Sequence, residues 1–112
     1  MADVYTLGNV GGISKTLLWD GDIASIGNYT LNDSVNNYKM IVVEHYLLYQ
    51  GVKYFQSLII ASIYTDPNNI YVVCHGNSSN DSSLDFYFST DGMTLIVKES
   101  FGEIISKIYG IN

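Results

Sequence analysis

The chain has 112 residues, a formal net charge of −6, and charged side chains at only 14% of positions. This length fits one domain. The charge argues against nucleic acid as a partner, because phosphate binding needs clustered Lys and Arg and this chain has five in total. With so few charges, much of the surface must consist of Ser, Asn, Thr, Gly and the ten tyrosines, which suits contact with other molecules.

Neither a leader sequence nor a membrane span is expected. The opening MADVYTLGNVGG lacks the basic start and apolar core of a signal peptide. Unbroken apolar runs such as 40–43 and 58–61 are far shorter than the roughly 20 residues of a membrane helix. The single cysteine, Cys74, lies in the apolar run IYVVCHG. We therefore expect a buried thiol in a strand and no internal disulfide.

The first half of the chain predicts an arm followed by strands. Residues 1–15 are rich in glycine and read as an N-terminal attachment arm, which leaves 16–112 as the folded domain. A strand begins at 17–19, and Asp20-Gly21-Asp22 indicates a tight turn or a bulge. A short strand is expected at 28–31. Residues 32–37 then form a polar connection with one helical turn, capped by Asp33 or Ser34.

Two strands in the middle of the chain are apolar on both faces. In 38–49, Ile41 and Val43 share one face while Met40 and Val42 share the other, which indicates a central strand. Residues 52–64 form one long strand or two short ones. The only proline lies in the turn at 65–69, and 70–75 is a second strand with two apolar faces.

The remaining segments complete an all-β pattern. A polar loop is expected at 76–83, followed by a strand in which Leu84, Phe86 and Phe88 alternate with polar or half-polar residues. Asp91-Gly92 indicates a hairpin into 93–98, and the last strand covers 104–111. About eight short strands without a helical period predict an antiparallel β-sandwich or jelly roll.

The strands with two apolar faces also predict self-association. A small two-layer sandwich buries one face of each strand, so a second subunit is needed to cover the other. We expect a homo-oligomer, specifically a homotrimer. The candidate contact residues are Met40, Val42, Tyr71 and Val73.

The residues with metal-binding side chains do not predict a metal site. His45, His75 and Cys74 all lie in expected strands, but adjacent residues such as Cys74 and His75 point to opposite faces, so we expect no zinc. Asp20 and Asp22 face the same side and could join oxygens from 77–81 around calcium. Because calcium takes about six to eight oxygen ligands, and Asp-Gly-Asp is common in turns, we expect no cofactor there either.

Catalysis is not expected. Sugar hydrolysis needs two opposed carboxylates at a defined separation. Candidates exist at Asp33, Glu44, Asp81, Asp85 and Glu99, as in any acidic domain. No Ser, His and Asp arrangement and no Cys and His spacing matches a nucleophilic site.

The tyrosines suggest a binding surface. A ring beside a strand can pack against its neighbours while its hydroxyl reaches water, and such rings also stack on sugars. Cross-strand pairs that fill the core are the alternative use, and both interpretations stay open. Tyr64, Tyr71 and Tyr87 also lie in or beside strands. The candidate ligand contacts are Tyr46, Tyr49 and Tyr54, with Asn77, Asn80 and Asp81 from the polar loop.

Residues 17–43, LLWDGDIASIGNYTLNDSVNNYKMIVV, carry a family resemblance. Their Leu-Trp pair, Gly corner, Thr-Leu strand and Asn-Tyr connection resemble the C-terminal head domains of bacteriophage tail fibres and minor structural proteins. The closing KIYGIN at 107–112 is similar to the ends of those proteins. DFYF at 85–88 and TDGMTL at 90–95 also fit the pattern.

The resemblance implies a trimeric β-sandwich at a fibre tip that touches the host surface. The protein would then be a virion component made in the bacterial cytoplasm. It would attach to other virion proteins through its N-terminal arm and contact a host cell-surface glycan. The resemblance assigns no sugar-binding residues, and we expect the polar loops at 32–37 and 77–83 to carry this function. Because no fibre shaft precedes the domain in this sequence, the alternative is a capsid or head-fibre decoration protein with a purely structural role.

Overall fold

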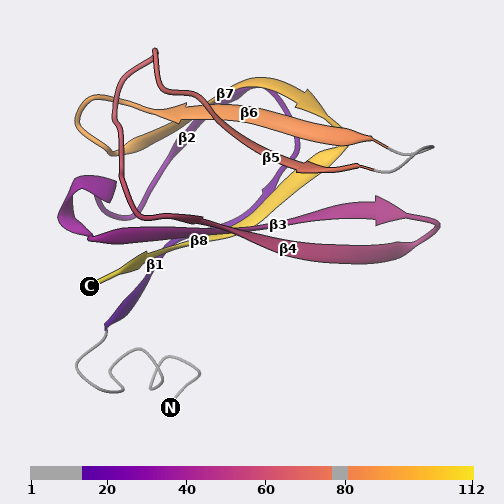
Figure 1. The fold of residues 1–112 in the computed structure, drawn as a ribbon, viewed down its shortest axis with the longest axis horizontal. Helices are drawn as coiled ribbons and strands as arrows, with labels where there is room; N and C mark the ends of the chain where they lie inside the picture. Colours follow the sequence, from indigo (N-terminus) through magenta and orange to yellow (C-terminus); the bar gives the residue numbers. More distant parts are fainter. Residues whose placement is uncertain (1–13, 77–80) are drawn as a thin grey trace.

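Two antiparallel sheets lie face to face in the computed structural model, which describes residues 14–76 and 81–112 (Figure 1). This confirms the predicted β-sandwich. The described elements are β1 (Lys15–Ile23), β2 (Gly27–Thr30), the 3₁₀ helix η2 (Val35–Asn37), β3 (Met40–Tyr49), β4 (Val52–Ile60), β5 (Tyr71–His75), β6 (Ser82–Phe88), β7 (Thr94–Phe101) and β8 (Glu103–Ile111).

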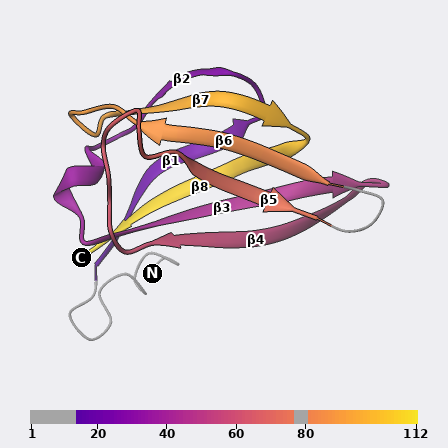
Figure 2. The same cartoon turned by 45° about the horizontal axis from the view of Figure 1, so that its top comes forward.

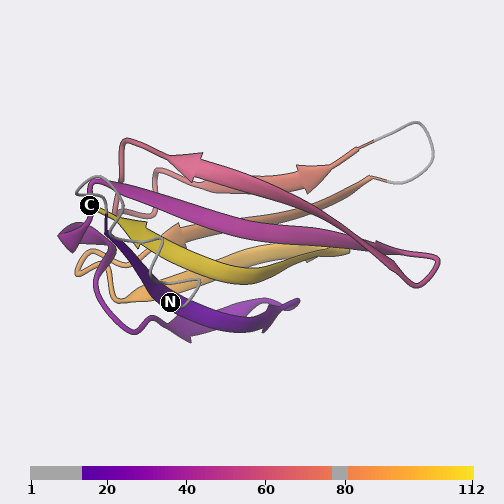
Figure 3. The same cartoon turned by 90° about the horizontal axis from the view of Figure 1, so that it is seen from below.

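Each sheet has four strands. The first sheet has the order β1-β8-β3-β4 and the second has the order β2-β7-β6-β5 (Figure 2). β4 therefore forms an edge of the first sheet and pairs along its whole length with β3 (Figure 3). The β3–β4 hairpin turns at Gln50 and Gly51, and both residues have positive φ.

Side chains that alternate along the strands fill the space between the sheets. Leu84, Phe86 and Phe88 are fully buried, as their spacing predicts. The rings of Phe86 and Phe88 meet edge to face with centroids 5.6 Å apart, and Tyr71 stacks on Phe86 at 5.5 Å. The buried cluster comprises Leu18, Ile23, Leu31, Val35, Ile41, Val43, Ile60, Val73, Leu84, Phe86, Phe88, Leu95, Val97, Ile105 and Ile108.

The Asp20-Gly21-Asp22 corner is a bulge inside β1. The pairing of β1 with β8 shifts register between Asp20 and Ile23, and Gly21 has a φ of +142°, which residues with a side chain rarely adopt. The indole N–H of Trp19 donates to the carbonyl oxygen of Gly21 at 2.8 Å. Of the two predicted outcomes, turn or bulge, the structure has the bulge.

The connection between β2 and β3 contains the predicted helical turn. Ser34 caps η2 by accepting a hydrogen bond from the backbone N–H of Asn36, so the cap is one of the two predicted residues. The Ser34 hydroxyl also donates to the carbonyl oxygen of Asp91 at 2.7 Å. Gly92, with a φ of +73°, approaches Ser34 so closely that a Cβ there would lie 2.4 Å from Oγ. The β2–β3 connection is thereby fixed onto the β6–β7 turn.

Two sequence expectations about strands need correction. Cys74 is exposed, not buried, because Tyr71, Val73 and His75 take the inward positions of β5 and the outward side of this edge strand is uncovered. The strand expected at 52–64 is a single one and ends at Ile60.

The arm expected at 1–15 falls largely outside the described residues. Ser14 and Asn112 exchange backbone hydrogen bonds of 2.9 and 3.0 Å, and Lys15 pairs with Ile111. Sheet pairing therefore already includes the last two residues of the expected arm. Among the described residues, no helix is long and apolar enough to cross a membrane.

The contact between Gly110 and Tyr38 generates a stability prediction. Gly110 is buried in β8, and a Cβ added there would lie 2.4–2.7 Å from atoms of the Tyr38 ring. Gly110→Ala should therefore lower the free energy of unfolding by about 1–3 kcal/mol, the usual cost of overpacking, as measured by urea denaturation. Because the Tyr38 ring is the group that the new Cβ would meet, Gly110→Ala should lower the free energy of unfolding by less in a Tyr38→Ala background. An equal cost in both backgrounds would contradict the contact.

The hydrogen bonds to the Asp33 carboxylate predict that the stability of the fold depends on pH. Its pKa lies below the usual 3.8 because the Tyr38 hydroxyl, the Ser34 backbone N–H and the Asn37 amide donate to it. A lowered folded-state pKa stabilises the fold above the unfolded-state pKa, and this contribution disappears as pH falls through the folded-state pKa. In urea unfolding, the wild type should exceed Asp33→Asn in stability at about pH 6, and the difference should shrink toward pH 3. Tyr38→Phe, which removes the leading donor, should weaken this pH dependence. A difference that does not change with pH would contradict the assignment.

Candidate functional site

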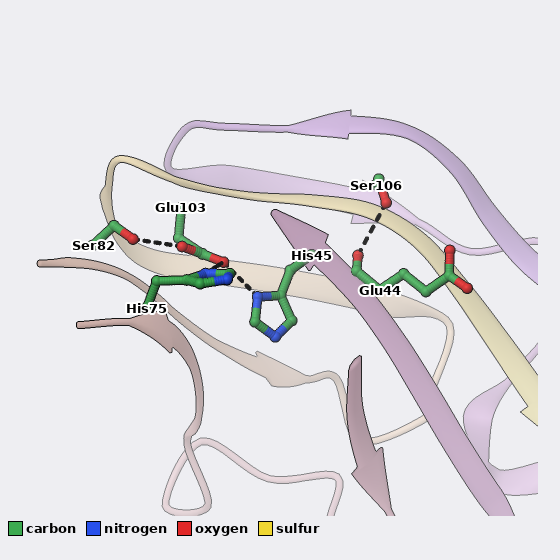
Figure 4. A network of polar contacts seen from close by, with 6 residues as sticks. All are labelled: Glu44, His45, His75, Ser82, Glu103 and Ser106. Carbon is green, nitrogen blue, oxygen red and sulfur yellow. Dashed lines mark hydrogen bonds and ion pairs between the residues drawn. The ribbon is translucent and has the colours of Figure 1, made fainter. Parts of the chain in front are cut away.

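A buried network of polar side chains joins the two sheets near the positions where β5 ends and β6 and β8 begin (Figure 4). Its members are His45 of β3, His75 of β5, Ser82 of β6 and Glu103 of β8. His45 and Glu103 belong to the first sheet, whereas His75 and Ser82 belong to the second. We call this set the His-Glu network.

Strand alternation explains why these polar residues point inward. His45 continues the buried positions Ile41 and Val43 at a spacing of two, and His75 is in phase with buried Val73. Glu103 precedes buried Ile105 by two positions. The pairing register then brings the four together, because His75 lies opposite Ser82, His45 lies opposite Ile105, and Glu103 lies opposite Leu47.

Glu103 is the centre of the network (Figure 4). One carboxylate oxygen, Oε2, contacts Nδ1 of His75 at 2.7 Å and Nδ1 of His45. The other, Oε1, accepts a hydrogen bond from the Ser82 hydroxyl at 2.5 Å. The two imidazole rings meet nearly edge to face, with centroids 5.5 Å apart. Both carboxylate oxygens therefore have polar partners, and these partners come from both sheets.

The network is almost entirely shielded from solvent. Glu103 has no exposed surface and His45 is 3% exposed, while the side chain of His75 is 13% exposed. A carboxylate buried to this degree is costly unless hydrogen bonds or a cation compensate for its lost hydration. Removing any one partner should therefore cost more than a surface hydrogen bond would.

Two imidazole nitrogens and a carboxylate oxygen are also the donor types that bind transition metals in proteins. The ligand atoms of His45, His75 and Glu103 all lie within 4.8 Å of one another. The cluster can therefore act either as a hydrogen-bond network that joins the sheets or as a three-ligand metal site.

Sequence reasoning missed this cluster for a specific reason. It compared His75 with Cys74, and the structure confirms that these two point to opposite sides, since Cys74 is exposed. It began the last strand at 104, one residue too late to include Glu103. The available signal was the period-two phase, because Glu103 shares its face with Ile105 just as His45 shares its face with Val43.

The three candidate tyrosines lie in different surroundings. Tyr49 and Tyr54 are 39% and 48% exposed on the β3–β4 hairpin. Tyr46 is only 3% exposed, and its hydroxyl donates to Asp22 at 2.9 Å. Burial, together with the hydrogen bond to Asp22, raises the pKa of Tyr46. Tyr46 thus serves in packing, where its ring lies 5.1 Å from that of Phe55.

The polar-loop candidates are described only in part. Asn77 and Asn80 lie outside the described residues, and Asp81 is exposed. Asp81 and Tyr49 line one hollow of about 230 Å³ at the hairpin end of the sandwich, which we call the tip hollow. Phe101, 70% exposed, also lines it. The full lining is Leu47, Leu48, Tyr49, Asp81, Ser82, Phe101 and Gly102.

The candidate oligomer contacts divide between the two sides of their sheets. Val73 is 1% exposed and belongs to the core, and Tyr71 stacks on Phe86, so both point inward. Met40 and Val42 are half-buried and alternate with the buried Ile41 and Val43, which places them on the outer face of the first sheet. Val72, 48% exposed, takes the outward position on β5.

A row of apolar side chains crosses the outer face of the first sheet. The register aligns Leu17 of β1 with Tyr109 of β8, Tyr109 with Val42 of β3, and Val42 with Ile59 of β4. Partners opposite one another in antiparallel strands share a face of the sheet. We call these four residues the outer row, and its edge residue Ile59 is 62% exposed.

Comparison with known proteins finds no matching family model, and no curated protein matches the chain.

Proposed function

We propose that this chain is a bacteriophage virion structural protein of the tail-fibre head type, which recognises the host surface without catalysis. The observation that carries the proposal is the group of exposed rings and aliphatic side chains around the tip hollow. The resemblance of residues 17–43 and 107–112 to phage fibre heads supports the same assignment.

The chemistry of the tip hollow suits a carbohydrate. Exposed rings offer flat apolar surfaces on which a sugar can stack, and Tyr49 and Phe101 supply two of them. Asp81 adds a carboxylate, a strong acceptor for sugar hydroxyl groups. Large exposed apolar side chains grouped at one end of a domain are typical of a contact surface.

The outer row supports self-association as part of the same function. It crosses all four strands of the first sheet and ends at the exposed Ile59 on edge strand β4. A second copy of this chain is the occupant we propose. A chain with only 14% charged residues brings few charges to lose hydration in such a contact. The trimeric state expected for fibre heads would place several tip hollows on one particle and raise their combined affinity for a surface.

Self-association gives the first functional prediction. The wild-type protein should be an oligomer by multi-angle light scattering at micromolar concentration, and Ile59→Glu should shift it to the monomer, because a charge would be buried in the contact. Val72→Glu is the matched control, since Val72 is 48% exposed on the outer side of the second sheet, and should leave the oligomer intact. A wild-type protein that stays monomeric would contradict the proposed contact.

Recognition gives the second functional prediction. The wild-type oligomer should bind at least one immobilised envelope glycan among lipopolysaccharide, capsular polysaccharide and wall teichoic acid. Loss of a central aromatic contact in Phe101→Ala should weaken that binding about tenfold or more in surface plasmon resonance. Tyr64→Ala removes a ring that is 51% exposed on the connection between β4 and β5, away from the tip hollow, and should bind like the wild type.

The capsid or head-fibre decoration role is the outcome that would replace this proposal. It would be favoured if the oligomer bound none of these glycans and no host envelope, while antibody labelling of intact particles placed the protein on the capsid.

A further inference from the structure

We propose that the His-Glu network is a Zn²⁺ site in which Nδ1 of His45, Nδ1 of His75 and Oε2 of Glu103 bind one ion. The first observation is convergence. The three residues come from three strands in two sheets, yet each offers a ligand atom within 4.8 Å of those of the other two. Both imidazole nitrogens already face the same carboxylate oxygen (Figure 4).

The donor set fits zinc better than a hard cation. Two histidines and one glutamate are a known ligand set for Zn²⁺, with bonds of about 2.0–2.2 Å and a tetrahedral arrangement. Such bonds place neighbouring ligand atoms about 3.3 Å apart. His75 Nδ1 and Glu103 Oε2 are 2.7 Å apart, so small side-chain rotations can admit an ion between them. Mg²⁺ and Ca²⁺ prefer all-oxygen sites, which this network does not offer.

Ser82 holds the Glu103 carboxylate in the orientation that a metal ligand needs. Ser82 is 4% exposed, and its hydroxyl donates to Oε1 at 2.5 Å, which leaves Oε2 directed at the two imidazoles. Carboxylate ligands of metals are commonly held by such a hydrogen bond to the second oxygen, and removing the donor typically costs about 10- to 100-fold in metal affinity. Ser82 is thus a positioning residue.

The burial pattern leaves one side for the ion to enter. Glu103 and His45 are closed off, whereas the side chain of His75 is 13% exposed at the end of β5. A water molecule from this side would supply the fourth ligand. Because His75 belongs to the second sheet and the other two ligands to the first, a bound ion would cross-link the sheets.

Zinc uptake tests the proposal on the full-length chain. The protein is treated with a chelator, freed of it, and titrated with ZnCl₂ by calorimetry, with bound metal counted by mass spectrometry. We expect one Zn²⁺ per chain. We also expect a rise in Tm on the order of 10 °C at a zinc concentration about 100-fold above Kd, since a ligand that binds only the folded state stabilises it. MgCl₂ should produce neither effect.

Variants separate the metal site from a metal-free hydrogen-bond network. Glu103→Gln and His75→Gln should lose stoichiometric uptake, and His75→Gln serves if the fully buried Glu103→Gln does not fold, because His75 reaches the surface. Ser82→Ala should bind about 10- to 100-fold more weakly. Cys74→Ser removes the adjacent, outward-facing thiol and should bind like the wild type.

Three results would overturn the proposal. They are a folded wild-type chain that takes up no zinc, uptake that is unchanged in both Gln variants, and uptake that is lost in Cys74→Ser. The first two would leave Glu103 as a carboxylate satisfied by hydrogen bonds alone, and the third would assign the zinc to the exposed thiol.

Discussion

The constraint that organises this molecule is that two sheets of four strands share one thin interior. Each strand can send only every second side chain into that interior, so the phase of each strand decides which residues meet. Along most of the sandwich the meeting residues are apolar and include Phe86, Phe88 and Ile108. Near the positions where β5 ends and β6 and β8 begin they are His45, His75 and Glu103, and the same geometry that builds the core assembles the polar network.

The network and the tip hollow are physically connected. Ser82 donates its hydroxyl to Glu103 and also lines the hollow beside Phe101 and Gly102. A carboxylate without exposed surface needs its partners held closely, which restricts the ends of β5, β6 and β8 where they meet. The proposed binding surface therefore rests on a part of the core held together by polar contacts between the sheets.

Apolar side chains on the outer faces of the two sheets are not covered by the opposite sheet. A two-layer fold has no third layer over its outer faces, so apolar residues there are covered by neighbouring side chains, stay exposed or indicate a partner. Lys53 and Phe55 cover Tyr46 locally, and the Lys53 ammonium lies 4.9 Å from the centre of the Tyr46 ring. Ile59, by contrast, is 62% exposed. The proposed self-association and host contact use different parts of this surface, so one subunit could serve both.

The sequence by itself determined the fold class and most strand positions, because these depend on alternation and on local backbone preferences. It narrowed Asp20-Gly21-Asp22 to a turn or a bulge and the helix cap to Asp33 or Ser34, and the structure decided for the bulge and for Ser34. Only the tertiary structure decided which faces are covered. It turned Cys74 outward, sent Val73 into the core and left Val42 outside, since the side of a strand that faces its partner sheet depends on long-range packing. The His-Glu network is likewise a feature that only the tertiary structure decided. Glu103 is 58 positions from His45 and 28 from His75, and no local pattern records a meeting between side chains so far apart in the chain.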